Sequence, residues 1–403
     1  MKKLLAVLLI SMFALVGCGK ANDSTLKFAI WDDTWQPAFQ TIIDEFESQN
    51  PDIKIKLELT PYSEYWQKLD TVSTTNKGPD LFVMNAISFK KYQESGIIAP
   101  ITDAMKDAGV KEEDFKENIL KPYQVDGEQY VMPFNHDMAI LVYNPDVIKA
   151  AGATVPTDYD DVFTQCQKLL DYDPDIMPYL FTEEQSGWWS ILGNMGGEVM
   201  DDDGTSAFDQ PVNLEMLEFV QKMAEKGYLP PSSRTSGLKA TDAVIGGLVG
   251  FAHDGSWMIP TFQEKYADQP IAIAPIPTNT DNQAGLVHAP GVAVNAKGEH
   301  VEEAQKFAAF IGSDFAAETV ASEMNQLSAK KGFDDIYLEN NKNVEGIEEL
   351  VAASGKGISY PAIADAEYIT KNAEIMTKLQ DQEIDAKEAA KQIDAMINES
   401  VKR

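Results

Sequence analysis

The chain has 403 residues, of which 44% are hydrophobic and 24% charged, an ordinary globular composition that excludes a collagen, a coiled-coil rod and a disordered chain. Its length exceeds one comfortable hydrophobic core, so about two domains are expected. The 64 acidic residues against 33 basic ones give a net charge of −31. A surface this negative repels nucleic-acid phosphates, and we expect no nucleic-acid partner.

The basic residues are almost all lysine, because Arg234 and Arg403 are the only arginines. Arginine is the usual bidentate clamp for phosphate and carboxylate groups. The chain is therefore a poor candidate for an anion receptor, although lysines and helix N-termini also bind anions.

The N-terminus has the pattern of a bacterial lipoprotein signal. Lys2 and Lys3 precede an apolar segment, 4–16, that is shorter than the about 20 residues of a membrane span. It ends in Leu15-Val16-Gly17-Cys18, which resembles the lipobox where signal peptidase cuts before a lipid-modified cysteine. We expect residues 1–17 to be removed and Cys18 to carry acyl chains such as palmitate. The alternative is a plain signal peptide with an incidental cysteine.

This reading locates the mature protein on the extracytoplasmic face of the cell membrane, or on the periplasmic side of it if the organism has an outer membrane. Two cysteines cannot form a disulfide framework. The second, Cys166, lies on the apolar face of a predicted helix, which indicates a buried structural thiol.

The first elements alternate between strand and helix patterns. Residues 26–31 alternate as a strand, and 35–46 have helical spacing with Thr34 as a candidate N-cap. Residues 53–59 form a second alternating run, 65–72 a second helical pattern, and 81–84 an unbroken apolar run that suits a central parallel strand. This order predicts the start of an α/β sheet.

The pattern changes at 129–144, where extended runs at 130–133 and 139–143 flank a polar break, Asn135-His136-Asp137. New α/β material follows. The predicted helices are about 158–171, 186–197, 212–226 and 301–311, with a helical C-terminal part at 362–401, and the predicted extended segments are 177–181, 248–252, 271–275 and 287–295.

Several segments stand in the order in which one known family has them: Trp31-Asp32-Asp33, the loop and strand at 76–82, the runs at 130–134 and 141–144, the turn at 155–159 and the segment at 250–257. Behind the lipobox, this order resembles extracellular solute-binding protein family 1, the receptors of sugar ABC importers. Tyr159 stands where the family usually has tryptophan. The return crossover, usually glycine-rich, contains His288 and Pro290 instead.

The resemblance implies an α/β, two-lobed periplasmic-binding-protein-like fold of type II, with a ligand cleft between lobes joined by crossing hinge segments. We expect lobe 1 at 18–136 plus 290–328 and lobe 2 at 137–289 plus 329–403. It implies a monomeric receptor that binds a neutral sugar or oligosaccharide and delivers it to the permease subunits of an ABC importer. It implies no chemistry, no cofactor and no metal ion.

A buried sugar needs aromatic faces for its C–H surfaces and hydrogen-bond partners for its hydroxyls. Open α/β sheets bind ligands at strand ends, which favours Trp31 and Asp33 after the first strand and Asn85 after the strand at 81–84. The other readings are that Asp32 or Asp33 caps the following helix and that Asn85 is a turn residue. Tyr62, Tyr65 and Trp66 share one helix face, for which core or lobe surface is the safer reading.

The remaining candidates follow from the family resemblance. Asp137 corresponds to a carboxylate that contacts sugar hydroxyls in maltodextrin-type relatives, and its alternative role is a hinge hydrogen bond. Trp257 matches a common stacking ring, with Asp254 beside it as a hydroxyl acceptor. Of the tandem pair Trp188 and Trp189, one ring is expected in the cleft and the other in the core. His288 and Tyr360 complete the predicted ligand contacts.

Three other readings stay open. A polyamine would suit the acidic surface and the aromatic residues. A secreted carbohydrate-active enzyme would need a carboxylate pair such as Asp33 and Asp137, one with a raised pKa. A purely structural surface lipoprotein would bind nothing in the cleft. The sequence has neither Gly-x-Ser-x-Gly nor a phosphate-binding Gly-x-x-x-x-Gly-Lys-Ser/Thr motif.

The lipobox generates the first prediction. Cys18→Ala removes the thiol that would carry the lipid, so the protein should leave the membrane fraction and appear in the soluble one, because two acyl chains are what hold such a protein on a bilayer. Fractionation followed by immunoblotting measures this. Unchanged membrane attachment of the variant would contradict a lipid anchor at Cys18.

Overall fold

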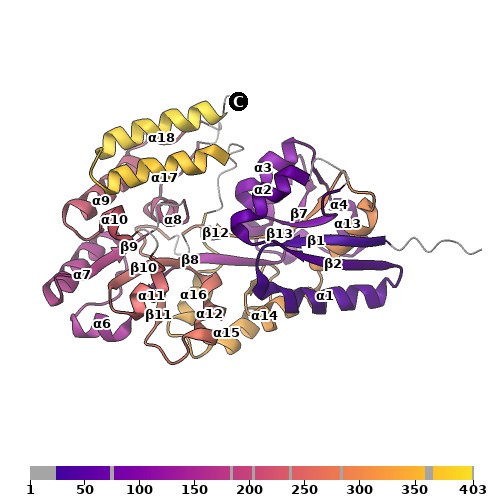
Figure 1. Ribbon diagram of the computed structural model, residues 1–403, viewed down its shortest axis with the longest axis horizontal. Coiled ribbons are helices and arrows are strands. Elements are labelled where there is room, and N and C mark those ends of the chain that lie inside the picture. Colours follow the sequence, from indigo (N-terminus) through magenta and orange to yellow (C-terminus); the bar gives the residue numbers. More distant parts are fainter. Residues whose placement is uncertain are drawn as a thin grey trace, which may run out of the picture.

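The computed structural model describes residues 24–72, 77–181, 185–201, 205–235, 238–281, 285–358 and 366–401. These residues form two lobes side by side, each built on one mixed sheet with helices on both faces (Figure 1). Cys18 and Tyr360 lie outside the described residues. None of the helices in these ranges has the length and apolar composition of a membrane span.

The lobe 1 sheet begins with three parallel strands in the order β2-β1-β3, followed by β13 and β4, with β7 also paired to β13. The sequence predicted the three parallel strands and missed the short β4. The strands are β1 (Ser24–Ile30), β2 (Ile53–Leu59), β3 (Leu81–Met84), β4 (Ile98–Ala99), β7 (Val131–Pro133) and β13 (Gly291–Asn295). β13 runs antiparallel to each of its three neighbours, so a late segment of the chain completes this sheet.

Helices cover both faces of this sheet. β1 turns Leu26, Phe28 and Ile30 to one face, whereas β3 is buried on both faces. Phe28 meets Phe39 of α1 and Phe307 of α13 edge-on, whereas α2 and α3 cover the opposite face. The helices of lobe 1 are α1 (Gln36–Gln49), α2 (Tyr62–Val72), α3 (Ala86–Glu94), α4 (Thr102–Asp107), α5 (Glu117–Leu120), α13 (Val301–Ile311) and α14 (Asp314–Ser322). The predicted cap Thr34 is wrong: Asp32 caps a short helix, η1 (Asp33–Trp35), and accepts from the backbone N and Oγ1 of Thr34 at 2.9 and 2.7 Å.

The lobe 2 sheet has the order β11-β8-β10-β9, with β12 and β14 paired to the first residues of β8. Its strands are β8 (Asn135–Tyr143), β9 (Met177–Leu180), β10 (Val249–Gly255), β11 (Ala272–Pro275), β12 (Val287–His288) and β14 (Leu327–Ser328). A small hairpin of β5 (Gln124–Val125) and β6 (Glu128–Gln129) stands apart. Every residue of β8 is buried, including the three that the sequence suggested were a break between strands.

One face of the lobe 2 sheet packs against α7, α8, α9, α17 and α18, and this core contains Cys166. The other face packs against α11, α12 and α16, and its core runs without interruption into that of lobe 1. The lobe 2 helices are α6 (Pro145–Ala150), α7 (Tyr159–Tyr172), α8 (Gln185–Met195), α9 (Pro211–Glu225), α10 (Ser232–Thr235), α11 (Ala240–Ile245), α12 (Ile259–Lys265), α15 (Asp334–Asn341), α16 (Ile347–Ala353), α17 (Ala366–Gln380) and α18 (Ala386–Val401).

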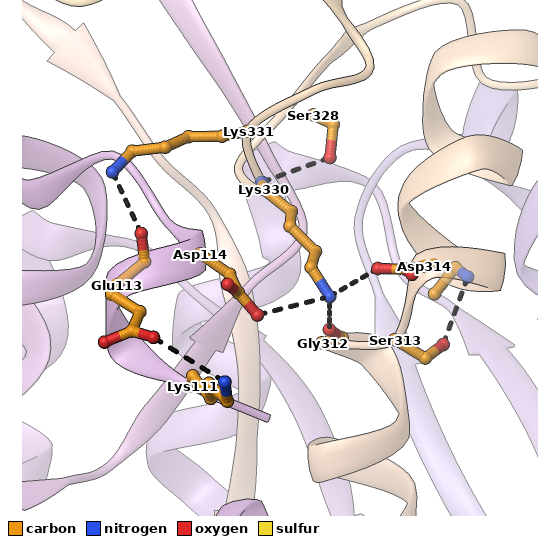
Figure 2. Close-up of polar contacts among 10 residues, drawn as sticks. Lys111, Glu113, Asp114, Gly312, Ser313, Asp314, Ser328, Lys330 and Lys331 are labelled. Carbon is orange, nitrogen blue, oxygen red and sulfur yellow. Dashed lines mark hydrogen bonds and ion pairs between the residues drawn. The ribbon is translucent and has the colours of Figure 1, made fainter. Parts of the chain in front are cut away.

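The chain changes sheets between β7 and β8, between β12 and β13, and between β13 and β14, and β14 (Leu327–Ser328) lies beside the third of the limits predicted at 136/137, 289/290 and 328/329. At the third crossover, Lys330 is held by lobe 1 (Figure 2): its Nζ lies 2.6 Å from Asp314 Oδ1 and donates to Gly312 O at 3.2 Å. Lys331 N donates to Asp114 O at 2.8 Å. These contacts favour a third limit after Lys331. The lobe limits themselves remain predictions.

A second lysine joins several elements near the same crossover. Lys116 Nζ donates to both carboxylate oxygens of Asp334 at 3.2 Å and to Ser354 Oγ at 3.0 Å, and it lies 3.4 Å from His136 Nε2. Burial lowers the pKa of Lys116, and Asp334 opposes that shift. Burial and the Lys116 charge hold the pKa of His136 well below its usual value, so this imidazole is neutral.

Candidate functional site

The candidate site lies where strand ends of both lobes meet. In lobe 1, Trp31 follows β1 and Asn85 follows β3. In lobe 2, β10 ends at Gly255, which pairs with Ala139 of β8. The carboxyl ends of strands are where open α/β sheets bind ligands. The charge of Asp32 in lobe 1 acts on Asp137 of β8, which places the two carboxylates near one another.

Trp31 belongs to an aromatic cluster on lobe 1. Its ring centroid lies 5.3 Å from that of Trp35, 5.6 Å from Tyr62, 5.1 Å from Tyr65 and 5.9 Å from Trp66. Trp35 and Tyr65 are buried, Trp31 and Trp66 are half-buried, and Tyr62 is 53% exposed. The shared face predicted for the three α2 aromatics is confirmed, and it packs around Trp31. The cluster offers ring surface that is large and partly open.

The polar candidates of lobe 1 differ in their surroundings. Asp33 is exposed, and the capping function falls to Asp32. Asn85 caps α3, because its Oδ1 accepts from Ser88 N at 2.9 Å. A capping oxygen is fixed in place, so a ligand contact by Asn85 would use its amide nitrogen.

Asp137 is 5% exposed and is fixed by two donors. Ser256 Oγ donates to Asp137 Oδ1 at 3.1 Å, and Asn135 Nδ2 donates to Oδ2 at 3.2 Å. Burial, opposed by these bonds and assisted by the charge of Asp32, raises the pKa of Asp137 to about 7. The hinge hydrogen bond considered from the sequence is therefore present. Asp137 as a ligand contact remains a prediction.

A pocket of about 470 Å³ opens beside the end of β10. Its wall includes the predicted residues Asp254 and Trp257, together with His253. Asp254 accepts from Thr241 Oγ1 at 3.3 Å and from Gly255 N at 2.8 Å, and burial raises its pKa to about 6. Pockets of this size hold small-molecule ligands.

The Trp257 indole is half-buried and lies flat over Gly255. A Cβ placed on Gly255 would come within 2.2 Å of three ring atoms, so a residue with a side chain there would displace the ring. The predicted residue His288 meets the same ring edge-on at 5.0 Å between centroids, and burial lowers the pKa of its imidazole to about 4. Gly255 and His288 together fix the position of Trp257.

The tandem tryptophans do not divide between cleft and core as predicted. Trp188 is fully buried and Trp189 is 2% exposed. Trp188 meets Trp189 and Phe208 edge-on, and Trp189 stacks on Tyr368 of α17 at 5.9 Å. Because the C-terminal helices cover α8, both rings pack inside lobe 2, and sequence spacing within one helix could not show that cover.

Two helices that complete the pocket, α11 and α12, were not predicted from the sequence. Lys239, Thr241 and Asp242, at the start of α11, and Lys265 and Tyr266, at the end of α12, line it. Tyr266 Oη donates to Asp242 at 2.6 Å. α11 covers only six residues and has a weak helical pattern, so little in the sequence marks it. Within the described ranges, no cluster of three or more His, Cys, Asp or Glu side chains is arranged to hold a metal ion.

Comparison with known proteins defines the family. The model of the bacterial extracellular solute-binding protein family matches residues 32–318, and the chain belongs to this family, whose members act outside the cytoplasm. A putative binding protein of Brucella abortus is 23% identical over 402 residues, covering 96% of each chain. The arabinooligosaccharide-binding protein of Bacillus subtilis is 24% identical over 339 residues, covering 77% of this chain and 76% of its own.

The fold is also that of solved binding proteins. A Listeria monocytogenes ABC substrate-binding protein, solved in complex with cycloalternan, superposes with a TM-score of 0.83 and 22% identity, over 94% of this chain and 99% of its own. The predicted fold class, a two-lobed α/β fold of type II, is thereby confirmed. Characterised relatives of this chain are binding proteins rather than enzymes.

The raised pKa of Asp137 generates a prediction about pH. Its folded-state pKa of about 7 lies above the ordinary 3.8, so the folded protein holds a proton that the unfolded chain releases. This proton uptake stabilises the folded protein at low pH. The stabilisation is complete below about pH 4, and roughly 2–4 kcal/mol of it is lost as the pH rises to about 7. The free energy of unfolding of Asp137→Asn should fall less over that interval than that of the wild type.

Urea unfolding at successive pH values measures both curves, and Asp33→Asn, at an exposed carboxylate, is the matched control. The other shifted groups, such as Asp254 and His288, contribute equally to wild type and variant and cancel in the difference. Parallel curves for Asp137→Asn and wild type would show that burial does not raise the pKa of Asp137.

Proposed function

We propose that this protein is a membrane-anchored, extracytoplasmic receptor that binds a sugar or oligosaccharide between its lobes and delivers it to the permease subunits of an ABC importer. It acts as a monomer, is held by lipid on Cys18 and catalyses no reaction. The observation that carries the proposal is the wall of the pocket, which combines the open Trp257 ring with the Asp254 carboxylate and the Thr241 hydroxyl. Ring faces and hydroxyl partners are what a sugar requires.

The relatives support this ligand class. The names and titles of similar proteins include arabinooligosaccharide, diacetylchitobiose, maltose and cycloalternan as ligands. The charges of the pocket disfavour a polyamine, since Lys239 and Lys265 line the same wall as Asp242 and Asp254. A neutral ligand faces no net repulsion from such a balanced set.

A binding screen tests the function. Isothermal titration of the mature protein with maltose, maltotriose, cycloalternan, diacetylchitobiose, arabinotriose, tagatose and spermidine should give one site per chain for at least one sugar and no heat with spermidine. Chromatography of the same mixtures should recover the sugar unchanged. Conversion of a sugar would indicate an enzyme, binding of spermidine alone would indicate a polyamine receptor, and no binding would favour a structural lipoprotein.

Lobe closure is part of the same proposal. Periplasmic binding proteins are a well-known example of domains that close about a hinge around their ligand, and the two lobes here meet at three crossovers. The radius of gyration measured by X-ray scattering should therefore decrease at a saturating concentration of a bound sugar from the screen. An unchanged radius would count against a closing cleft.

Trp257 provides a residue-level prediction. If its half-buried ring packs on a sugar face, Trp257→Ala removes about 2–4 kcal/mol of binding, a loss of affinity of about 30- to 1000-fold. The melting temperature should change little. Trp188→Ala is the matched comparison, because this fully buried ring should instead cost about 3–5 kcal/mol of folding. A large fall in melting temperature for Trp257→Ala with unchanged affinity would assign Trp257 to the core.

A further inference from the structure

Ser256 is a buried serine directly before Trp257, at the point where β10 ends and the short helix η4 (Ser256–Met258) begins. It is 3% exposed and is not part of the wall of the pocket, although Asp254 and Trp257 on either side of it are. A molecule in the pocket therefore contacts the neighbours of Ser256 and not its hydroxyl. An effect of Ser256 on binding has to act through the position of another side chain.

The Ser256 hydroxyl makes two hydrogen bonds, both with β8. Its Oγ donates to Asp137 Oδ1 at 3.1 Å and accepts from Met138 N at 3.1 Å. Both partners are buried, and both belong to the part of β8 that directly follows the crossing from lobe 1. Because a buried group that loses its partner is costly, these two bonds hold the start of η4 against the crossing strand.

The Trp257 ring is confined by two other residues that are also joined to β8. A side chain on Gly255 would collide with the ring, and Gly255 pairs with Ala139 of β8. His288 of β12 meets the ring edge-on at 5.0 Å between centroids, and it pairs with Asp137 of β8. The position of the ring is therefore set by three residues that are each joined to the segment 137–139.

We propose that Ser256 is a positioning residue of the pocket, which holds the Trp257 ring to β8 and so couples the stacking of a sugar on that ring to the closure of the lobes. The proposal rests on the proposed sugar-binding function. When lobes move about crossing segments, the first residues of β8 change their arrangement, and the ring follows through Ser256. A sugar that fits the ring better in one arrangement shifts the protein toward that arrangement.

Fluorine NMR of the protein labelled with fluorotryptophan reports the environment of the ring without any ligand. Trp257→Phe identifies the Trp257 signal among those of the six tryptophans. We expect Ser256→Ala to shift or broaden this signal, as Gly255→Ala should also do because its methyl group displaces the ring. An unchanged Trp257 signal in Ser256→Ala would overturn the positioning role, whatever the protein binds.

Ser206→Ala is the matched control for the loss of a buried hydroxyl. Ser206 is 4% exposed, its Oγ accepts from Phe208 N at 3.2 Å, and it is not part of the wall of the pocket. Its substitution should leave the Trp257 signal unchanged. Thermal unfolding of both serine variants controls for lost folding.

Sugar binding and lobe closure are measured on the same variants. For a panel sugar that the wild type binds, we expect Ser256→Ala to bind about tenfold more weakly and Ser206→Ala to bind within about threefold of wild type. At a saturating concentration of that sugar, the radius of gyration should decrease less for Ser256→Ala than for the wild type. Saturation removes the difference in affinity, so a smaller decrease reports the coupling itself.

The outcomes distinguish this proposal from the function on which it rests. A wild-type protein that binds a panel sugar and closes, while Ser256→Ala binds and closes equally well, contradicts the coupling and leaves the receptor function intact. A wild-type protein that binds none of these sugars contradicts the sugar-binding function, and the coupling falls with it. The fluorine signal still decides whether Ser256 positions the ring.

Discussion

The burial of three polar residues at the start of β8 is the constraint on which the rest of the structure depends. Asn135, His136 and Asp137 have at most 5% of their surface exposed, at the point where the chain passes from one lobe to the other. Buried polar groups need partners. Their backbones pair with β14 and β12, which are the other two crossing segments. The pairing of β8 with β12 and β14 therefore brings all three crossovers together.

The same constraint links the crossovers to the candidate site. The Ser256 hydroxyl that bonds Asp137 directly precedes Trp257, and it also accepts from Met138 N at 3.1 Å. His288, which is paired with Asp137 across β12 and β8, packs on the Trp257 ring. β8 is thus connected to the Trp257 ring by two short paths, which link the crossovers to the wall of the pocket.

The sequence predicted the fold where the pattern was local and strong. The alternation in β1 and β2, the apolar run of β3 and the long helices were found because their own side chains carry the signal. The prediction of a break at Asn135–Asp137 was wrong, because the partners of these polar residues lie up to about 190 positions away in the sequence, as for Asn135 and Gln326. Polar residues are predicted to be exposed unless their partners are known.

The candidate site was predicted only in part, because some of its contacts also join residues far apart in the sequence. Trp257 and Asp254 were found through a resemblance, and both lie in the wall of the pocket, with His288 against the Trp257 ring. Trp188 and Trp189 were expected to divide between cleft and core, but both rings are buried, Trp189 against Tyr368 of α17, and no local pattern reports a contact with a residue more than 170 positions later. The contact of 2.7 Å between His253 Nε2 and Tyr179 Oη joins two strands, so it too depends on tertiary structure alone.

The position of β13 in the lobe 1 sheet has a consequence for synthesis and export. It is hydrogen-bonded to β3, β4 and β7, so these strands are not joined into one sheet until residues 291–295 are available. Unpaired strand edges favour association with other chains. We infer that a nascent chain that ends before Gly291 stays unfinished and protease-sensitive in its first lobe, although most of that lobe has already been made. For a member of a family that acts outside the cytoplasm, this delay would preserve the unfolded state that passage through a membrane channel requires.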